Sequence, residues 1–257
     1  MSQPQGGPPE NPVLQYYKEW SAKTPYVTRS STIGMIIMYI SSFFLKVDLV
    51  LGNQPYFTVI HLEIYRIVLS PLVGNSILSI LMILLFYPQM GSKFEYSMGS
   101  AAYLSLLGII TIVTNVAFDA ICMGLNFAGS PLSLFWMCSG FWLILFAMIM
   151  MECQQNPDQP RRLLCVPFDI PSRYFPLVLY ALICLMSGPQ LDLAVAIGVG
   201  YLHSINQLAI FTPSTSFLER CESSGLMSYC AGGDGWISVS GAAGGAAWSQ
   251  EAAARTG

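Results

Sequence analysis

The sequence predicts an all-α, polytopic membrane protein: a bundle of six transmembrane helices with an interfacial first loop. Hydrophobic residues make up 54% of the 257 residues and charged residues only 10%, whereas roughly a quarter of the residues in a soluble domain are charged. The mean hydropathy is +0.55. The net charge of −3 excludes a nucleic-acid-binding protein, which needs a basic surface. Five long stretches carry no charged residue: 67–92, 96–118, 120–151, 174–191 and 193–218.

A helix of about 20 apolar residues spans the hydrocarbon core of a bilayer. The uncharged stretches divide best into six such helices, of which the first and the fifth are short. Segment 52–70 has charged residues dispersed among apolar ones, a composition typical of a helix that lies in the membrane interface. The six spans are predicted in order at 32–45, 71–87, 100–122, 132–151, 175–186 and 191–211.

The distribution of basic residues predicts the orientation, because Lys and Arg near helix ends accumulate on the cytoplasmic side. With both termini cytosolic, the inner segments hold nine of the eleven basic residues, and only Lys46 and Arg66 remain outside. An even number of crossings is therefore favoured. Counts of four or seven helices spoil this segregation.

The composition divides the chain into three parts. Residues 1–27 are rich in Pro, Gln and Gly and predict a flexible N-terminal segment without a cleaved secretory signal. Residues 28–213 form the membrane domain, and 214–257 are expected to form a flexible Gly-, Ala- and Ser-rich cytosolic tail. The cysteines form no C-x-x-C pair, so we expect neither a disulfide framework nor a metal site, and no cofactor.

Motifs in a fixed order resemble the rhomboid superfamily, and the chain is similar to the six-helix eukaryotic rhomboids related to derlins and to ubiquitin-associated-domain rhomboids. The first loop ends in an aromatic-Arg pair, Tyr65-Arg66, and the second helix ends in G-S-x-x-E-x-x-x-G-S at 91–100. The similarity continues through 145–152, 168–176, 200–202 and 213–219. The tail is too short for the three-helix ubiquitin-associated domain, so that domain is not expected in this chain.

The resemblance implies where a rhomboid protease would carry its catalytic residues, and each position is replaced here. The nucleophile motif G-x-S-G falls on Gly140-Phe141-Trp142-Leu143, so Trp142 occupies the Ser position. Leu193 occupies the position of the catalytic His in helix six. The oxyanion-binding His and Asn positions fall on Ser79 and Ile83. Without a nucleophile and a base, we expect an inactive pseudoprotease.

A shifted dyad of Ser139 and His203 is the alternative that would retain protease activity. Proton transfer requires hydrogen-bond reach, about 3 Å. His203 lies ten residues after Leu193, which places it about 15 Å farther along a helix. This pair is therefore not expected to function, and an active intramembrane serine protease remains the remote alternative.

The remaining candidate residues concern binding and packing. Ala196, Gly198 and Gly200 form a stripe of small residues that allows close helix packing. Asp119 and Asp192 are interpreted as structural residues near helix ends, as are His203, Asn206 and Gln207 within helix six. The resemblance implies a lateral opening between helices two and five, and contacts with a client or partner are expected at Tyr65, Arg66, Trp142 and Phe175.

By resemblance to derlins, the leading hypothesis is a non-catalytic protein that binds transmembrane segments of clients or partner subunits in membrane-protein quality control or trafficking. The expected location is the endoplasmic reticulum membrane, with the Golgi and the mitochondrial inner membrane as alternatives. A structural accessory subunit of a larger, possibly organellar, membrane complex is the second hypothesis. A small transporter or channel is disfavoured, because the sequence shows neither repeat symmetry nor mid-membrane charges.

Overall fold

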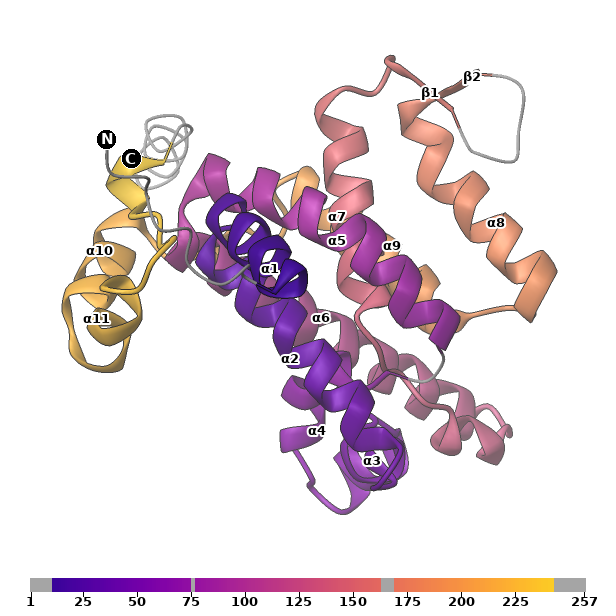
Figure 1. Ribbon diagram of the computed structural model, residues 1–257. Coiled ribbons are helices and arrows are strands. Elements are labelled where there is room, and N and C mark those ends of the chain that lie inside the picture. Colours follow the sequence, from indigo (N-terminus) through magenta and orange to yellow (C-terminus); the bar gives the residue numbers. More distant parts are fainter. Residues whose placement is uncertain (1–10, 75–76, 163–168, 243–257) are drawn as a thin grey trace, which may run out of the picture.

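The computed structural model describes residues 11–74, 77–162 and 169–242, and helices dominate it (Figure 1). The all-α expectation is therefore confirmed. Two three-residue strands, β1 (Pro160–Arg162) and β2 (Asp169–Pro171), pair antiparallel at one end. The α-helices are α1 (Pro12–Lys23), α2 (Tyr26–Ser42), α3 (Val47–Leu51), α4 (Tyr65–Leu69), α5 (Ile77–Met98), α6 (Ser100–Phe127), α7 (Trp142–Gln155), α8 (Phe175–Ser187), α9 (Leu191–Ser204), α10 (Thr215–Ser223) and α11 (Gly225–Ala231).

Short turns of helix connect these elements. The π-helical turn η1 spans Tyr56–Ile60. The 3-10 turns are η2 (Ser70–Leu72), η3 (Pro131–Phe135), η4 (Ser172–Tyr174), η5 (Ala209–Phe211) and η6 (Val239–Gly241). The expected interfacial segment 52–70 thus consists of η1, α4 and the start of η2 rather than one continuous helix. In Figure 1 it lies with α3 at the opposite end of the molecule from β1 and β2.

Among the described residues, α6 alone is both long and apolar enough by itself to cross a membrane. Three further helices are apolar but shorter: α7, the η4–α8 segment and α9. Each of the six predicted spans overlaps a helix, namely α2, α5, α6, α7, α8 and α9 in order. The predicted start at Ser100 coincides with the first residue of α6.

The second, fourth and sixth predicted spans differ most from the observed helices. The second begins at Ile77 and continues to Met98, because its charged end is satisfied within the protein: Lys93 pairs with Glu152 of α7 at 2.5 Å. The fourth begins only at Trp142, because residues 136–140 are not helical and Cys138 exchanges two backbone hydrogen bonds with Asn53 of the first loop. The sixth ends at Ser204, before Asn206 adopts a positive φ of 62°.

Both segments that were expected to be flexible contain ordered helices, although residues 1–10 and 243–257 lie outside the described part. Residues 12–23 form α1. After α9, residues 215–241 fold back onto the beginnings of α2 and α6, where they pack Leu218 and Val239 against Ala101. Trp236 lies against Tyr26, with ring centroids 5.7 Å apart. We call residues 215–241 the C-terminal unit.

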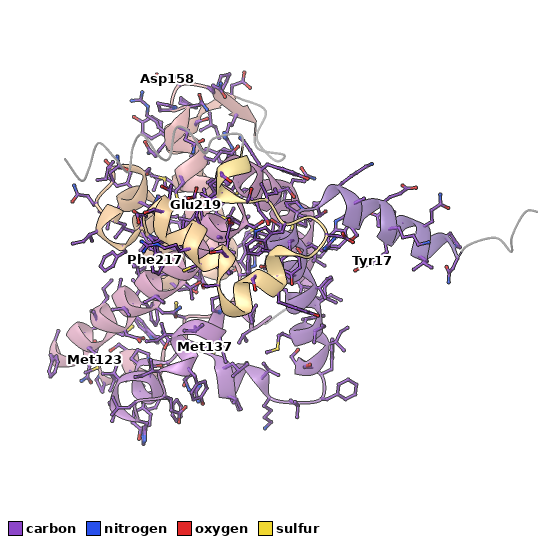
Figure 2. All side chains as sticks on the ribbon, turned by 90° about the vertical axis from the view of Figure 1, so that its left-hand side faces the viewer. Tyr17, Met123, Met137, Asp158, Phe217 and Glu219 are labelled. Atoms are coloured by element: carbon purple, nitrogen blue, oxygen red, sulfur yellow. The ribbon has the colours of Figure 1, made fainter. Side chains whose placement is uncertain are left out.

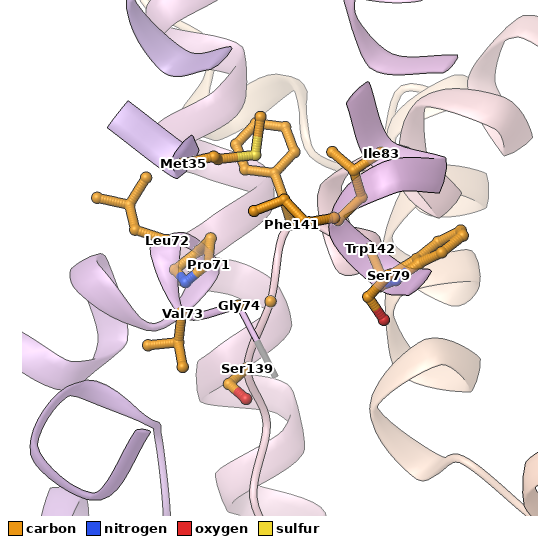
Figure 3. Close-up of a pocket in the computed structure, with 12 residues that line it drawn as sticks. Met35, Pro71, Leu72, Val73, Gly74, Ser79, Ile83, Ser139, Phe141 and Trp142 are labelled. Atoms are coloured by element: carbon orange, nitrogen blue, oxygen red, sulfur yellow. The ribbon is translucent and has the colours of Figure 1, made fainter. Parts of the chain in front are cut away.

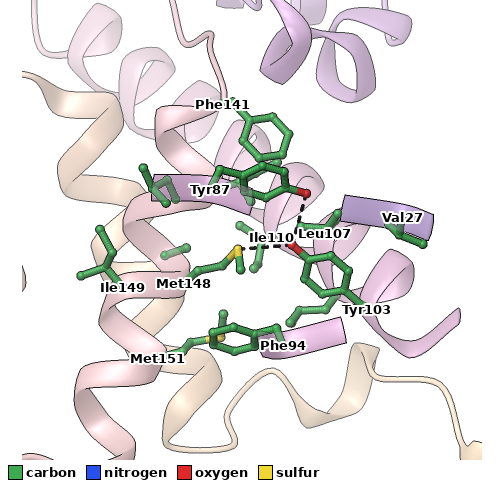
Figure 4. Packing of buried hydrophobic residues seen from close by; sticks show 14 of the residues in the cluster. Val27, Tyr87, Phe94, Tyr103, Leu107, Ile110, Phe141, Met148, Ile149 and Met151 are labelled. Carbon is green, nitrogen blue, oxygen red and sulfur yellow. Dashed lines mark hydrogen bonds between the residues drawn. The ribbon is translucent and has the colours of Figure 1, made fainter. Parts of the chain in front are cut away.

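The core centres on α7, whose residues 143–151 are all buried. One side of α7 packs with α5 and α6 around Tyr87, Tyr103 and Met148 (Figure 4). The Tyr103 hydroxyl donates to that of Tyr87 at 3.2 Å and contacts the Met148 sulfur at 3.8 Å. The other side packs against α9. This arrangement fixes the first turn of α7, where the candidate site lies.

Candidate functional site

A small cavity of about 40 Å³ lies beside the first turn of α7 (Figure 3). Its lining comes from four separate parts of the chain: α2, η2 with the residues that follow it, α5, and the segment that leads into α7. Most of these side chains are apolar, and Ser79 and Ser139 supply the hydroxyl groups. The lining residues are Met35, Pro71, Leu72, Val73, Gly74, Ser79, Ile80, Ile83, Ser139, Gly140, Phe141 and Trp142.

Four of the five positions that the resemblance assigns to the catalytic motifs line this cavity. Ser79 and Ile83 reach it from α5, and Gly140 and Trp142 reach it from the start of α7, about 60 residues later. In the close-up, Trp142 and Ser79 lie together at one side of the cavity (Figure 3). Residues aligned independently at different motifs therefore converge in space.

Leu193, the fifth replaced position, lies outside the cavity but close to it. It is buried at the start of α9 in a cluster with Cys138, Leu143 and Phe146. Trp142 packs against this cluster and also against the main core cluster. The indole therefore lies between the two clusters, in contact with both.

The backbone that leads into α7 is tightly specified. Gly140 has a φ of +97°, a conformation in which an L side chain is strained. Its N–H donates to the Ser70 carbonyl at 2.9 Å. Two residues earlier, the Cys138 N–H donates to the Asn53 carbonyl at 2.8 Å. The first loop thus holds the strand-like segment 138–140 in place, and Trp142 begins the helix directly afterwards.

The structure keeps Ser139 and His203 apart. Ser139 lines the cavity, where its side chain is visible in Figure 3. His203 lies in the last turn of α9, ten residues beyond Leu193, which corresponds to about 15 Å along the helix axis. Since Cys138, next to Ser139, shares a cluster with Leu193 at the start of α9, His203 lies at the far end of α9 from Ser139, beyond hydrogen-bond reach, and the two side chains do not form a catalytic dyad.

Helix α8 forms the lightly attached side of the structure. Of its described residues only Pro176 is buried, and Leu185 and Met186 near its far end are largely exposed. Phe175 and Leu179 pack partly against the core. The Arg161 guanidinium lies 5.8 Å from the centre of the Phe175 ring. Figure 1 shows α8 standing apart from α5.

Arg66, one of the residues predicted to contact a partner, lies inside the first loop. It is only 5% exposed. Its guanidinium donates to the carbonyls of Leu49 and Gly52 at 2.8 Å each and pairs with Glu63 at 2.5 Å. Hydrogen bonds from Arg66 and Tyr65 hold the Glu63 pKa below its usual range. Arg66 therefore organises the loop, whereas Tyr65 remains substantially exposed.

A buried polar cluster joins this loop to α6, and the sequence alone did not predict it. Asn53 donates to Asn115 at 2.8 Å and to Asp119 at 3.0 Å. Its side-chain oxygen accepts from Thr58, and the Ser70 hydroxyl donates to Asn115 at 3.2 Å. The signal in the sequence was that Asn115 and Asp119 lie one turn apart on the apolar helix α6. Asn53 and Ser70, which bond to them, lie more than 40 residues away in the sequence.

The small-residue stripe of α9 contributes unequally to packing. A Cβ added at Gly200 would lie 2.5 Å from the Ala147 carbonyl oxygen and 2.8 Å from its Cα, so the backbones of α7 and α9 are in contact there. Ala196 is fully buried one turn earlier. A Cβ at Gly198 would meet no atom within 4 Å. Gly198 therefore takes no part in this contact.

Comparison with known proteins adds no relative: neither a family model nor a curated protein matches this chain. Within residues 11–74, 77–162 and 169–242, no three His, Cys, Asp or Glu side chains are grouped so as to hold a metal ion. The site is thus an apolar cavity with two hydroxyl groups and an indole. Such a lining suits hydrophobic contact better than acid–base chemistry.

Proposed function

We propose that this chain is a catalytically inactive rhomboid-like membrane protein that binds transmembrane segments of client proteins or partner subunits. One observation carries the proposal: Ser79 and Ile83, assigned through one motif, and Gly140 and Trp142, assigned through another, line a single cavity. Convergence in space is what a shared ancestral site would produce. A chance resemblance of short motifs would scatter these positions.

Hydrolysis has no support in this arrangement. Acyl transfer needs a nucleophile, a base within hydrogen-bond reach and donors for the oxyanion. Trp142 has no nucleophilic atom, Leu193 has no proton acceptor, and Ile83 offers no donor. Ser139 is the remaining hydroxyl beside Gly140, and His203 is too distant to accept its proton. Without a nucleophile and a base, the cavity can contact a bound segment but cannot cleave it.

The ligand class follows from the lining and from α8. Helices associate in membranes through close van der Waals packing and scattered hydrogen bonds, and the cavity offers apolar surface with the Ser79 and Ser139 hydroxyls. Helix α8 packs on the core mainly through one face. Movement of α8 away from the core would therefore widen a lateral entrance beside α5. A hydrophobic helix with small or polar interruptions fits such an entrance.

The proposed membrane arrangement uses α2, α5, α6, α7, α8 and α9 as spans. Of these six helices, α6 alone combines the length and the apolar character for an ordinary bilayer, so its shorter neighbours would thin the membrane around the protein. Lys93, Glu152 and Arg161 form an ion-pair group at the proposed cytosolic end. Thinning and a lateral entrance both suit the handling of transmembrane segments, and the resemblance to derlins favours the endoplasmic reticulum.

Site-specific photo-crosslinking in cells tests this proposal. A photoreactive amino acid at Ile80 places the probe in the cavity, and the same residue at Leu81 places it on the exposed side of the same helix. We expect Ile80 to capture membrane proteins through their transmembrane segments and Leu81 to capture mainly lipid. Equal protein capture from both positions would contradict a binding role for the cavity. A single protein captured in fixed stoichiometry would instead indicate an accessory subunit of one complex.

A further inference from the structure

Helix α1 carries an aromatic face that the described part of the protein leaves largely uncovered. Tyr16, Tyr17 and Trp20 are spaced so that their side chains share one face of the helix. On the opposite side, the Gln15 side chain donates to Glu19 at 3.4 Å. Tyr16 is 72% exposed and Tyr17 46% exposed. Figure 2 shows α1, marked by the Tyr17 label, leaving the body sideways.

The orientation of α1 is nevertheless fixed by contacts at its C-terminal end. The Arg29 guanidinium of α2 donates to the Ser21 hydroxyl at 2.7 Å and to the Ser21 carbonyl at 3.1 Å. The Tyr96 hydroxyl of α5 donates to the Lys23 carbonyl at 3.3 Å. Pro25 then makes the turn into α2. Because these bonds link α1 to two proposed spans, its aromatic face points in a defined direction.

The position of α1 indicates what covers this face. Its last residue is three positions before Tyr26, where the first proposed span begins, so lipid headgroups lie beside it. Tyr and Trp are the residues enriched at membrane–water interfaces, because their rings are amphipathic. Lys18 and Lys23 give the helix positive charge that favours an anionic surface.

We propose that α1 is an interfacial helix that lies on the cytosolic surface of the bilayer, with Tyr16, Tyr17 and Trp20 among the phospholipid headgroups. This inference rests on the proposed membrane arrangement and adds an attachment outside the six spans. An amphipathic helix of this kind binds through buried aromatic area and charge attraction. Together with the contacts to Arg29 and Tyr96, it would set the depth at which α2 sits in the membrane.

Fluorescence quenching in liposomes tests the inference with the full-length chain. The protein is reconstituted into phosphatidylcholine and phosphatidylserine vesicles brominated either near the headgroup end or near the terminus of the acyl chains. The difference between wild type and Trp20→Phe isolates Trp20 from the other four tryptophans. We expect Trp20 to be quenched more strongly by the shallow bromines. The double variant Tyr16→Glu, Tyr17→Glu should lose this quenching, and Gln15→Glu on the polar face should retain it.

The alternative outcomes are distinct. If the other tryptophans are quenched and Trp20 is not, the chain is membrane-embedded but α1 does not lie on lipid, and the inference is overturned. Stronger quenching of Trp20 by the deep bromines would also overturn it, because α1 would then be inserted. If no tryptophan is quenched, the membrane arrangement itself fails, and the inference fails with it.

Discussion

Glu95, near the end of α5, accepts a hydrogen bond from the backbone N–H of Thr28 at 2.8 Å and a second from the Thr28 hydroxyl at 2.8 Å. Its other carboxylate oxygen accepts from the Val27 N–H at 2.8 Å and from the Ser100 hydroxyl at 2.6 Å. The first N–H groups of a helix lack partners within the helix, and no local side chain caps α2. A residue 67 positions away therefore provides the cap.

Removal of this carboxylate should destabilise the protein strongly. Glu95→Ala leaves two buried backbone donors and two hydroxyls without their acceptor, which we expect to cost about 2–4 kcal/mol. Glu95→Gln keeps the volume but points an amide donor at other donors, so it should not restore stability. Thermal unfolding of the purified protein in detergent measures both. Glu19→Ala on the exposed surface of α1 is the control, and an equal effect there would contradict the capping role.

The two glycines of α9 offer a matched pair of variants. Gly200→Ala forces a methyl group into the Ala147 backbone, and we expect a loss of about 1–3 kcal/mol from overpacking. Gly198→Ala meets open space and has the higher helix propensity, so it should be neutral or stabilising by up to about 1 kcal/mol. Thermal unfolding of the two variants measures this difference in stability. Similar destabilisation by both would show that α9 does not pack on α7 in this register.

Substitution within the polar cluster beneath the first loop should destabilise the protein. Asn53→Ala removes the donor to Asn115 and Asp119 and the acceptor for Thr58 in a fully buried site. We expect a loss of about 2–3 kcal/mol, because buried polar groups are left unsatisfied. The control is Asn126→Ala, which removes the same group near the end of α6. Stability equal to wild type in Asn53→Ala would show that the loop is not held through this residue.

Docking of the C-terminal unit should depend on pH. Burial raises the pKa of Glu222, and the negative charge of Glu219 adds to this effect. A carboxyl group whose folded pKa lies above the unfolded value of about 4.3 binds more protons when folded. Stability therefore rises as pH falls through the folded pKa and is fully gained below the unfolded one.

Hydrogen exchange of a peptide that contains Val239 measures this local effect, after correction for the intrinsic dependence of exchange on pH. Protection should increase as the pH is lowered toward the unfolded pKa of about 4.3. Glu222 accepts hydrogen bonds from the Trp236 indole and the Val239 N–H, both through Oε1, and Glu222→Gln keeps an acceptor there. This variant should be well protected throughout this pH range. Protection that falls on acidification of wild type would refute the assignment.

The hydropathy of the sequence located helices well where apolar character and local structure coincide. Helix α6 starts at Ser100 as predicted, because Gly99 with a φ of +91° ends the preceding helix. The fourth predicted span begins too early, since the apolar residues 132–141 contain the 3-10 turn η3 and a segment in which Cys138 and Gly140 bond to the backbone of Asn53 and Ser70. Hydropathy does not register such non-local hydrogen bonds.

Motif alignment predicted the candidate site better than it predicted individual roles. It brought Ser79, Ile83 and Trp142 to what proved to be one cavity. It did not reveal that Arg66 is buried. The helices outside the proposed spans were missed for a different reason: α1 and α10 are rich in polar residues and become ordered through partners such as Arg29 and Ala101.

Labelling of the purified protein with a fluorophosphonate, in detergent and in liposomes, tests the central claim most directly, because this reagent reacts with activated serines. Under the proposed function Trp142 stands in place of the nucleophile and His203 is out of reach of Ser139, so we expect no labelling above a denatured control, and no difference between wild type and Ser139→Ala. Labelling of the native protein that disappears in Ser139→Ala would show an active serine beside Gly140 and would contradict a non-catalytic binding cavity.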